Sequence, residues 1–431
     1  MTPAKGRLLI RGGRLLDPSL GIDGRRDLLI EDGRVAEVAE SIPVGAEVEV
    51  VEAAGLVVAP GLIDLHVHLR EPGQEYKETV ETGTRAAAAG GFTAVASMPN
   101  TVPVNDNRAV TQHILTQAAR HGYARVHPVA AVSKGQKGAE LCEFGELVEA
   151  GAAAFSDDGL PVANSDLMRR ALLYARHFGR PLMQHAEDLA LTGNGVMHEG
   201  MWSTRLGLPG IPGVAEDVLI ARDLILAEET GGRYHLQHTS TARGLELVRA
   251  ARARGVAASC EVSAHHLLLT DEEVAKSGIS TNTKMKPPLR SEQDREALVA
   301  GLADGSIEVI ASDHAPHHAD EKDRDYTQAP FGIVGLETTL PLVLDRLVRP
   351  GLVSLGRVIE ALTVAPARVL GLEAGSLRRG NMADLTLIDL ERELVVDPSR
   401  FQSKSRNTPF AGWKLRGAAV ATYLAGRRVV L

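Results

Sequence analysis

Hydrophobic and polar residues alternate in short runs at both ends of the chain. Near the N-terminus, residues 27–38 read as two strands around Asp32-Gly33, a dipeptide typical of a tight β-hairpin. Near the C-terminus, apolar runs cover residues 383–390, 394–396, 419–424 and, after a turn at Ala425-Gly426, 429–431. Neither end alone has enough apolar surface for a core, so we expect both ends to pack together as one β-sandwich.

The longer central part alternates strand-like runs with helical patterns, which is typical of βα units around a parallel sheet. Helices are expected at residues 78–89 and 214–230, each followed by a glycine pair. Eight strand-like runs can be counted, at residues 57–66, 93–98, 125–130, 153–156, 181–185, 234–238, 256–262 and 307–313. We therefore expect an α/β fold in which residues 57–375 form a (β/α)8 TIM-type barrel, with a small β-sandwich domain formed by residues 1–56 and 376–431.

Composition narrows the classes of function. A chain of 431 residues suits one large domain with a smaller one, and a net charge of −8 argues against a general surface for nucleic acid or anionic membrane. Two cysteines, Cys142 and Cys260, cannot form a disulfide framework, and residues 1–20 lack the apolar core of a signal peptide. The longest nearly apolar run, residues 55–63, is shorter than the about 20 residues that cross a bilayer. We expect a soluble cytoplasmic protein that binds a small molecule.

Histidines and acidic residues stand at the C-terminal ends of the strand-like runs, where barrel enzymes place their active sites. His66 and His68 alternate along one run, so both imidazoles point to the same face and can converge on a metal ion. His185, His238 and Asp313 end three further runs. Any one of these residues alone is more typical of a polar core. Together they exceed what one zinc ion with three protein ligands and an open position requires, so two metal ions are the more economical interpretation.

Two adjacent metal ions need a bridging anion. Asp157-Asp158, followed by Gly159, ends the fourth run and supplies carboxylates at the required edge of the barrel. Alone, this sequence would be typical of a solvated turn. Its place on the rim favours a bridging role for one of the two carboxylates.

Longer motifs resemble those of the dihydroorotase family. Residues 64–72, Asp-Leu-His-Val-His-Leu-Arg-Glu-Pro, are similar to the first signature of the family, and residues 311–317 followed by Lys322 are similar to the second. Further stretches resemble the bacterial class I enzymes, at residues 98–100, 155–159, 184–187, 238–240, 261–266 and 284–290. The resemblance spans nearly the whole chain and implies a metal-dependent barrel of the amidohydrolase superfamily.

The resemblance also implies roles for individual residues. It assigns His66, His68 and Asp313 to one zinc ion and His185 and His238 to a second. Asp158 is the implied bridge; many relatives use a carboxylated lysine, whereas the acidic pair resembles a subset of bacterial dihydroorotases. The implied substrate contacts are His68, Arg70, Asn100, Lys286, His317, Phe331 and Gly332, the last two after a polar loop at 318–328 that is long enough to close over a ligand. Lys286 is a departure, because relatives commonly carry asparagine there.

The implied reaction is the reversible zinc-dependent cyclisation of N-carbamoyl-L-aspartate to (S)-dihydroorotate, in de novo pyrimidine biosynthesis (UMP). Metal binding can lower the pKa of water from 15.7 to about 7, which supplies hydroxide without a serine or cysteine nucleophile. Asp313 is the expected catalytic residue, carrying the proton between hydroxide and ring nitrogen. The planar fork of Arg70 suits a substrate carboxylate.

Two alternatives stay open. One is another cyclic amidase, such as a hydantoinase, dihydropyrimidinase or allantoinase, which prefers a bridging lysine and uncharged ring substituents. Arg70 and the acidic pair count against it. The other is a catalytically silent homologue that serves as a structural partner of aspartate transcarbamoylase. The intact set of metal-binding residues counts against it. We also expect a homodimer, with association with aspartate transcarbamoylase left open.

Overall fold

Eight parallel strands form a nearly closed barrel in the computed structural model, which describes residue 4 and residues 6–430. In chain order they are β6 (Leu62–Val67), β7 (Phe92–Ser97), β8 (Arg125–Ala130), β9 (Ala154–Phe155), β10 (Leu182–Gln184), β13 (Tyr234–Leu236), β14 (Ala258–Ser263) and β15 (Val309–Ala311). The first and last strands meet where the His68 backbone N–H donates to His314 O, at 2.9 Å. Apart from the first, the strands coincide with the expected runs to within about two residues, which confirms the (β/α)8 barrel.

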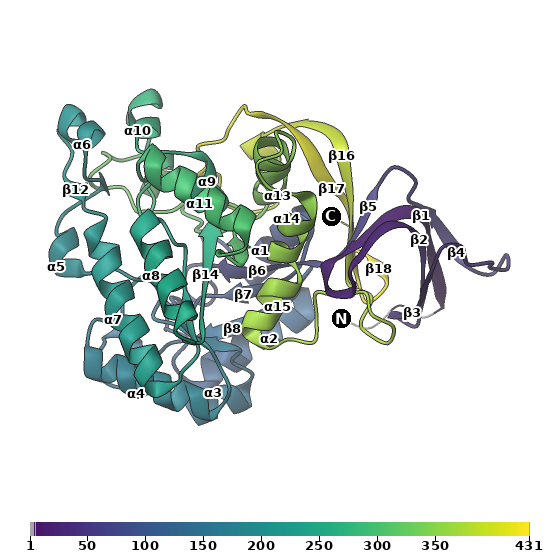
Figure 1. Cartoon of the computed structure of the whole chain (residues 1–431), viewed down its shortest axis with the longest axis horizontal. Helices are drawn as coiled ribbons and strands as arrows, with labels where there is room; N and C mark the ends of the chain where they lie inside the picture. The colour runs from purple at the N-terminus through teal and green to yellow at the C-terminus, as the bar shows by residue number, and fades with distance from the viewer. Residues whose placement is uncertain (1–3, 5, 431) are drawn as a thin grey trace.

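Helices follow the strands and cover the barrel (Figure 1). The longer ones are α1 (Val80–Ala89), α2 (Arg108–His121), α3 (Phe144–Ala150), α4 (Ser165–His177), α7 (Val214–Thr230), α8 (Ala242–Ala253), α11 (Glu292–Asp304), α14 (Leu355–Leu362) and α15 (Val364–Leu370). Helix α7 has the expected bounds. Helix α1 begins at Val80 rather than at residue 78, because Thr79 caps it by accepting a hydrogen bond from the Thr82 N–H. In the described part of the chain, no helix combines the length and apolar character that crossing a membrane requires.

Short elements occupy the connections on the strand C-terminal side and near the second domain. They are α5 (Leu189–Thr192), β11 (Met197–His198), α6 (Met201–Leu206), β12 (Gly210–Ile211), α9 (Ala264–Leu268), α10 (Glu272–Lys276), α12 (Ala319–Lys322) and α13 (Thr339–Val343). Strands β11 and β12 form a separate two-stranded sheet. Helix α12 lies in the polar loop at 318–328, so that loop has a helical turn of its own.

Both ends of the chain build the second domain. Its strands are β1 (Arg7–Asp17), β2 (Ile22–Glu31), β3 (Arg34–Ala39), β4 (Glu49–Glu52), β5 (Val57–Pro60), β16 (Leu385–Val395), β17 (Lys414–Leu424) and β18 (Arg427–Arg428). They are joined in the order β18-β17-β16-β5-β1-β2-β3, with β4 beside β1. Figure 1 shows the purple N-terminal strands and the yellow C-terminal strands on the same side of the barrel. The joint β domain of the prediction is therefore confirmed.

Two expected runs differ from the strands observed. Residues 57–66 form two strands: β5 pairs with β1 and β16, whereas β6 enters the barrel. The chain changes sheets at Gly61, where a Cβ atom would collide with the side chain of Thr93. An apolar run carries no sign of such a change. The last strand, β18, precedes the expected run at 429–431, of which Leu431 lies outside the described residues. The domain boundaries at 56/57 and 375/376 stay a prediction.

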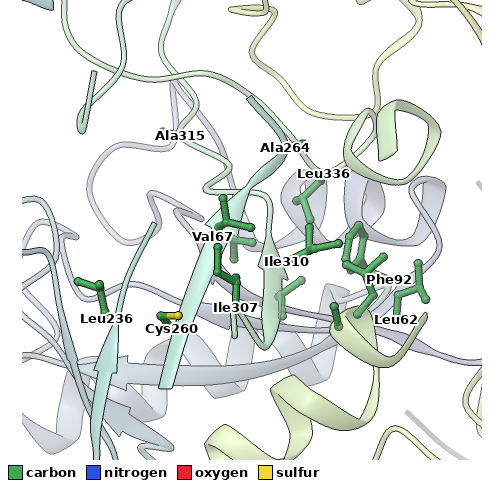
Figure 2. Packing of buried hydrophobic residues seen from close by; sticks show 14 of the residues in the cluster. Leu62, Val67, Phe92, Leu236, Cys260, Ala264, Ile307, Ile310, Ala315 and Leu336 are labelled. Carbon is green, nitrogen blue, oxygen red and sulfur yellow. The ribbon is translucent and has the colours of Figure 1, made fainter. Parts of the chain in front are cut away.

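Two apolar clusters fix the barrel. The larger packs the outer side chains of the strands against the helices, and Figure 2 shows Leu62, Phe92, Ile307 and Ile310 within it. Burying such a side chain contributes about 1.5–3 kcal/mol. The other cluster joins side chains from six strands to α15: Leu65, Ala96, Val129, Ala154, Met183, Val309, Val369 and Leu370. The barrel is therefore a packed core rather than a pore, and the polar strand ends are held rigidly at its mouth.

The β domain is attached to the barrel at the end of α1. Thr386 Oγ1 donates to Gly91 O at 2.6 Å, and Thr422 Oγ1 donates to Ala88 O at 2.8 Å. Gly91 has a φ of +93°, and a Cβ atom there would lie 2.9 Å from Ala419 Cβ and from Thr386 Cγ2. The two domains therefore approach too closely at this point for any side chain.

We expect Gly91→Ala to lower the free energy of unfolding by about 1–3 kcal/mol through overpacking at this contact. Gly305→Ala is the matched control, because Gly305 has a similar φ of +83° but its Cβ atom would have no neighbour within 4 Å among the described residues. Urea unfolding of both variants measures the difference. Equal losses would show that backbone strain, and not contact between the domains, makes glycine necessary at position 91.

Candidate active site

Six chemically reactive side chains meet at the mouth of the barrel, at the C-terminal ends of its strands. We call them the six-residue centre: His66 and His68 at the end of β6, Asp158 after β9, His185 after β10, His238 after β13 and Asp313 after β15. All six are buried. The parallel strands bring together residues that lie far apart along the chain, as the sequence pattern predicted.

The Asp158 carboxylate lies between two pairs of imidazoles. Its Oδ2 atom is 3.2 Å from His66 Nε2 and 3.4 Å from His68 Nε2. Its Oδ1 atom is 3.7 Å from His185 Nδ1 and 3.5 Å from His238 Nε2. One carboxylate oxygen thus faces each pair.

Asp313 lies nearest the first pair, with Oδ1 at 3.4 Å from both His66 Nε2 and His68 Nε2. Its carboxylate also groups with ring nitrogens of His66 and His238, all within 4.8 Å of one another.

The backbone at the mouth is strained. Asp313, His238 and Arg70 have φ values of +46°, +32° and +61°, a region that residues with a Cβ atom rarely adopt. Such strain is typical of functional sites, where surrounding structure imposes it.

The six-residue centre fits a divalent cation. Among the described residues, His66 Nε2, Asp158 Oδ1 and Asp313 Oδ2 are buried without a hydrogen-bond partner, and each such atom costs about 1–3 kcal/mol when it stays unpaired. His185 Nδ1 and His238 Nε2 are only 2.8 Å apart. Imidazole nitrogens and carboxylate oxygens are the ligands that zinc accepts in proteins. The arrangement therefore suits a bound metal ion.

Both carboxylates of the centre are held in the charged form. Burial disfavours the charge of Asp158, but His66 and the neighbouring imidazoles of His185 and His238 keep its pKa well below the ordinary value. The pKa of Asp313 is likewise lowered, because His66 and His68 outweigh its burial. Metal ligands must be deprotonated, so both groups are ready to bind at neutral pH.

Asp157 is excluded from the centre by its own hydrogen bonds. Its Oδ1 accepts from the backbone N–H groups of Val132 and Ser133 at 2.8 and 3.0 Å, and its Oδ2 accepts from Ser133 Oγ. Asp157 therefore shapes the turn after β9, while the neighbouring Asp158 reaches the imidazoles.

Glu261 on β14 supports the centre from behind, a role that the sequence pattern did not reveal. Its Oε1 accepts from His66 Nδ1 at 2.7 Å and from the His238 N–H at 3.2 Å, and its Oε2 accepts from His235 Nε2 at 3.1 Å. Burial opposes its charge, yet His66 lowers the pKa of Glu261 to about 2. This charged acceptor turns His66 Nε2 toward Asp158. The sequence signal that could have indicated this role is that Glu261 is an acidic residue within a buried strand.

Arg70, Asn100 and His317 lie beside the centre. Arg70 is buried, with Nε donating to Pro316 O at 3.2 Å and Nη2 at 3.4 Å from His317 Nε2. Burial lowers the pKa of Arg70 to about 10, so the guanidinium keeps its charge at neutral pH. Asn100 Oδ1 accepts from His68 Nδ1 at 2.8 Å. The mouth thus places a buried positive group beside the six-residue centre.

Phe331 and Gly332 are fixed against His317. His317 Nε2 donates to Phe331 O at 2.9 Å. Gly332 has a φ of +153°, and a Cβ atom there would lie 2.6 Å from Ala315 O and 2.7 Å from His317 Cδ2. Only glycine fits at position 332, because the backbone there approaches Ala315 and His317 so closely. Lys286 also reaches this region, but its Nζ lies 3.0 Å from Glu187 Oε1.

Comparison with known proteins identifies relatives along almost the whole chain. A family model described as dihydro-orotase-like matches residues 55–244, and one described as the amidohydrolase family matches residues 221–430. A dihydroorotase of Anaeromyxobacter dehalogenans is 56% identical over 98% of this chain and 97% of its own length. A dihydroorotase of Syntrophotalea carbinolica is 54% identical and is covered over 98% of both chains. The chain belongs to the dihydroorotase family.

Solved structures with the same fold include an L-hydantoinase (dihydropyrimidinase) from Arthrobacter aurescens. It is 26% identical, has a TM-score of 0.88 and matches 100% of this chain and 96% of its own. A dihydropyrimidinase from Brevibacillus agri, 22% identical with a TM-score of 0.85, matches 99% of this chain and 95% of its own and shares the fold. The barrel with its β domain is therefore common to cyclic amidases, and this chain is a metal-dependent cyclic amidohydrolase of the dihydroorotase family.

In this family member, two buried lysines hold the backbone that leads to Phe331. Lys284 Nζ donates to Ala329 O at 2.6 Å and to Thr327 O at 3.2 Å. Lys322 Nζ donates to Pro330 O at 2.9 Å and to Gly332 O at 3.2 Å. Burial lowers the pKa of Lys284 to about 8 and that of Lys322 to about 7. The sequence motifs predicted Lys322 only as part of the second family signature. Its contacts show that it holds the backbone around Pro330 and Gly332.

Asn407, from the C-terminal segment, ties the same backbone to the barrel. Its Nδ2 donates to Ala315 O at 2.9 Å and to Gly332 O at 3.0 Å, while its Oδ1 accepts from the His317 N–H at 3.1 Å. The sequence pattern gave no indication of this contact, because Asn407 lies 90 residues from His317 in a segment expected to build only the β domain.

We expect Asn407→Asp to loosen the loop at 318–328. The substitution keeps the shape but replaces two donors by a carboxylate that faces two carbonyl oxygens, a loss of about 1–3 kcal/mol. Trypsin should therefore cleave after the exposed Arg324 about tenfold faster or more.

The matched control is Asn381→Asp, because Asn381 Nδ2 donates to Ser376 O at 3.3 Å in the β domain. It should leave cleavage after Arg324 unchanged. Equal cleavage rates for wild type and Asn407→Asp would show that Asn407 does not restrain this loop.

Proposed function

We propose that the protein is a dihydroorotase that interconverts N-carbamoyl-L-aspartate and (S)-dihydroorotate in de novo pyrimidine biosynthesis. The observation that carries the proposal is the buried Arg70 beside the six-residue centre. The centre suits the hydrolysis of a cyclic amide, and the guanidinium suits a substrate that carries a carboxylate.

We infer that two zinc ions occupy the centre. His66, His68 and Asp313 would hold one, His185 and His238 the other, and Asp158 both. The support for this division is that each oxygen of Asp158 faces a different pair of imidazoles. The hydrogen bonds of Asp157 support Asp158 as the bridge. When bound, the metal supplies hydroxide at neutral pH and polarises the scissile carbonyl.

Asp313 moves the proton in this proposal. Its Oδ2 is buried without a hydrogen-bond partner among the described residues, so it is free to accept one. In ring opening, Asp313 takes the proton of the attacking hydroxide and delivers it to the ring nitrogen as the C–N bond breaks. In ring closure it removes the proton from the ureido nitrogen and returns it to the departing carboxylate oxygen, which leaves as hydroxide.

Substrate orientation falls to the side chains and backbone around Arg70. The guanidinium binds the substrate carboxylate, and Asn100, His317 and the backbone at Phe331-Gly332 surround the ring. His68 contributes through its place between Asn100 and Asp158. Burial of Arg70 strengthens its interaction with an anion, because water competes less there.

The alternatives fit less well. Curated relatives at 51–56% identity are dihydroorotases, whereas the substrate of a hydantoinase would leave the buried Arg70 without a partner. A silent structural homologue would not need the unpaired ligand atoms of the centre. A homodimer, association with aspartate transcarbamoylase and a cytoplasmic location remain proposals that rest on the family resemblance.

We expect the purified protein to contain up to two zinc ions per chain and to hydrolyse dihydroorotate. Metal content by mass spectrometry and turnover before and after a strong chelator test this. A hydantoin without a carboxylate is the control substrate and should react about 10–100-fold more slowly, since one charge-assisted contact contributes about 1.5–3 kcal/mol. Full turnover by metal-free protein, or a preference for the hydantoin, would contradict the proposal.

We expect Asp313→Asn to lower kcat about 10²–10⁴-fold with little change in KM, because asparagine keeps one ligating oxygen but cannot carry the proton. Zinc content measured on the same sample separates proton transfer from metal loss. The control is Asp320→Asn, an exposed residue in the nearby loop. Turnover within about tenfold of wild type, with zinc retained, would mean that another group carries the proton.

A further inference from the structure

Lys286 lies at the mouth of the barrel, yet its ammonium group faces an acidic side chain of the protein itself. Its Nζ is 3.0 Å from Glu187 Oε1. The Lys286 side chain is 24% exposed and that of Glu187 is 7% exposed, so the pair is largely withdrawn from water. The same ammonium lies 5.1 Å from the centre of the Phe331 ring. The positive charge of Lys286 is therefore already paired within the protein.

Glu187 connects this ion pair to the six-residue centre. Its second oxygen, Oε2, accepts from His185 Nε2 at 3.3 Å. The opposite nitrogen of that ring, His185 Nδ1, faces Asp158 Oδ1 at 3.7 Å and His238 Nε2 at 2.8 Å. A continuous series of contacts therefore runs from Lys286 through Glu187 to His185, which belongs to the second pair of imidazoles.

The chemistry of imidazole explains how this series of contacts can affect metal binding. A histidine offers a lone pair at Nδ1 only when the proton is at Nε2, and an acceptor at Nε2 fixes that tautomer and the ring orientation. Glu187 is such an acceptor. A buried carboxylate is costly without a positive partner, and Lys286 supplies it.

We propose that Lys286 is a positioning residue for the second metal position: it holds Glu187, which presents Nδ1 of His185 to the metal. The proposal rests on the two-metal centre proposed above. It gives Lys286 a role within the protein in place of the substrate contact expected from its position in the sequence.

The first metal position does not depend on the contacts among Lys286, Glu187 and His185. His66 is oriented by Glu261 at 2.7 Å and His68 by Asn100 at 2.8 Å, and neither contact includes Lys286 or Glu187. Replacing Lys286 should therefore weaken the binding of only one of the two zinc ions. This asymmetry separates a specific role from a general loss of structure.

The test is competition for zinc between the full-length protein and a chromophoric chelator. We expect Lys286→Met, which keeps the length of the side chain but removes its charge, to weaken the second zinc equivalent about 10–100-fold and leave the first unchanged. Glu187→Gln should do the same. The double variant should be no weaker than the weaker single variant, because both act through one contact.

Lys276→Met is the matched control, because Lys276 forms an exposed ion pair with Glu272 at 2.8 Å. It should bind both zinc equivalents as wild type does. Two tightly bound zinc ions in Lys286→Met and Glu187→Gln, with KM for dihydroorotate raised in Lys286→Met, would overturn the inference and leave the proposed function intact. A wild-type protein that binds no second zinc ion would overturn the inference together with the two-metal centre on which it rests, whereas turnover of dihydroorotate by that protein would leave the proposed reaction intact.

Discussion

Burying the Asp158 carboxylate costs several kcal/mol unless positive groups surround it, and the architecture of the mouth follows from that constraint. Imidazoles stand on both of its sides, supplied by three different barrel strands. They can meet there only because parallel strands end at one rim. The left-handed backbone of His238 and Asp313 indicates that the packed barrel holds these residues in place against a local preference.

A second layer of polar groups gives the imidazoles their direction. In three of the histidines one ring nitrogen faces the centre and the other is held from outside: His66 by Glu261, His68 by Asn100 and His185 by Glu187. The backbone at Phe331-Gly332 is held in a similar way by Lys322 and Asn407. The reactive groups are therefore arranged before any ligand arrives, which limits the entropy lost on binding.

Much of this organisation could be predicted from the sequence, because strand periodicity places residues at strand ends and the barrel brings those ends together. The six-residue centre lies where the runs predicted it. Other features depend on contacts that periodicity does not encode. The chain changes sheets at Gly61, within a run that reads as one strand in the sequence. Asp157 and Asp158 are the same residue type and differ only in the groups that surround them. Asn407 contacts His317 from a distant segment. The role of Lys286 likewise required the position of Glu187.

Anomalous X-ray diffraction at the zinc edge, from crystals of the zinc-loaded protein, tests the proposal that Asp158 joins two metal ions. We expect two peaks, one beside His66 and His68 and one beside His185 and His238. Each should lie about 2.0–2.2 Å from a different oxygen of Asp158. A single peak, or two peaks with Asp158 turned away from either of them, would show that Asp158 does not bridge two metal ions.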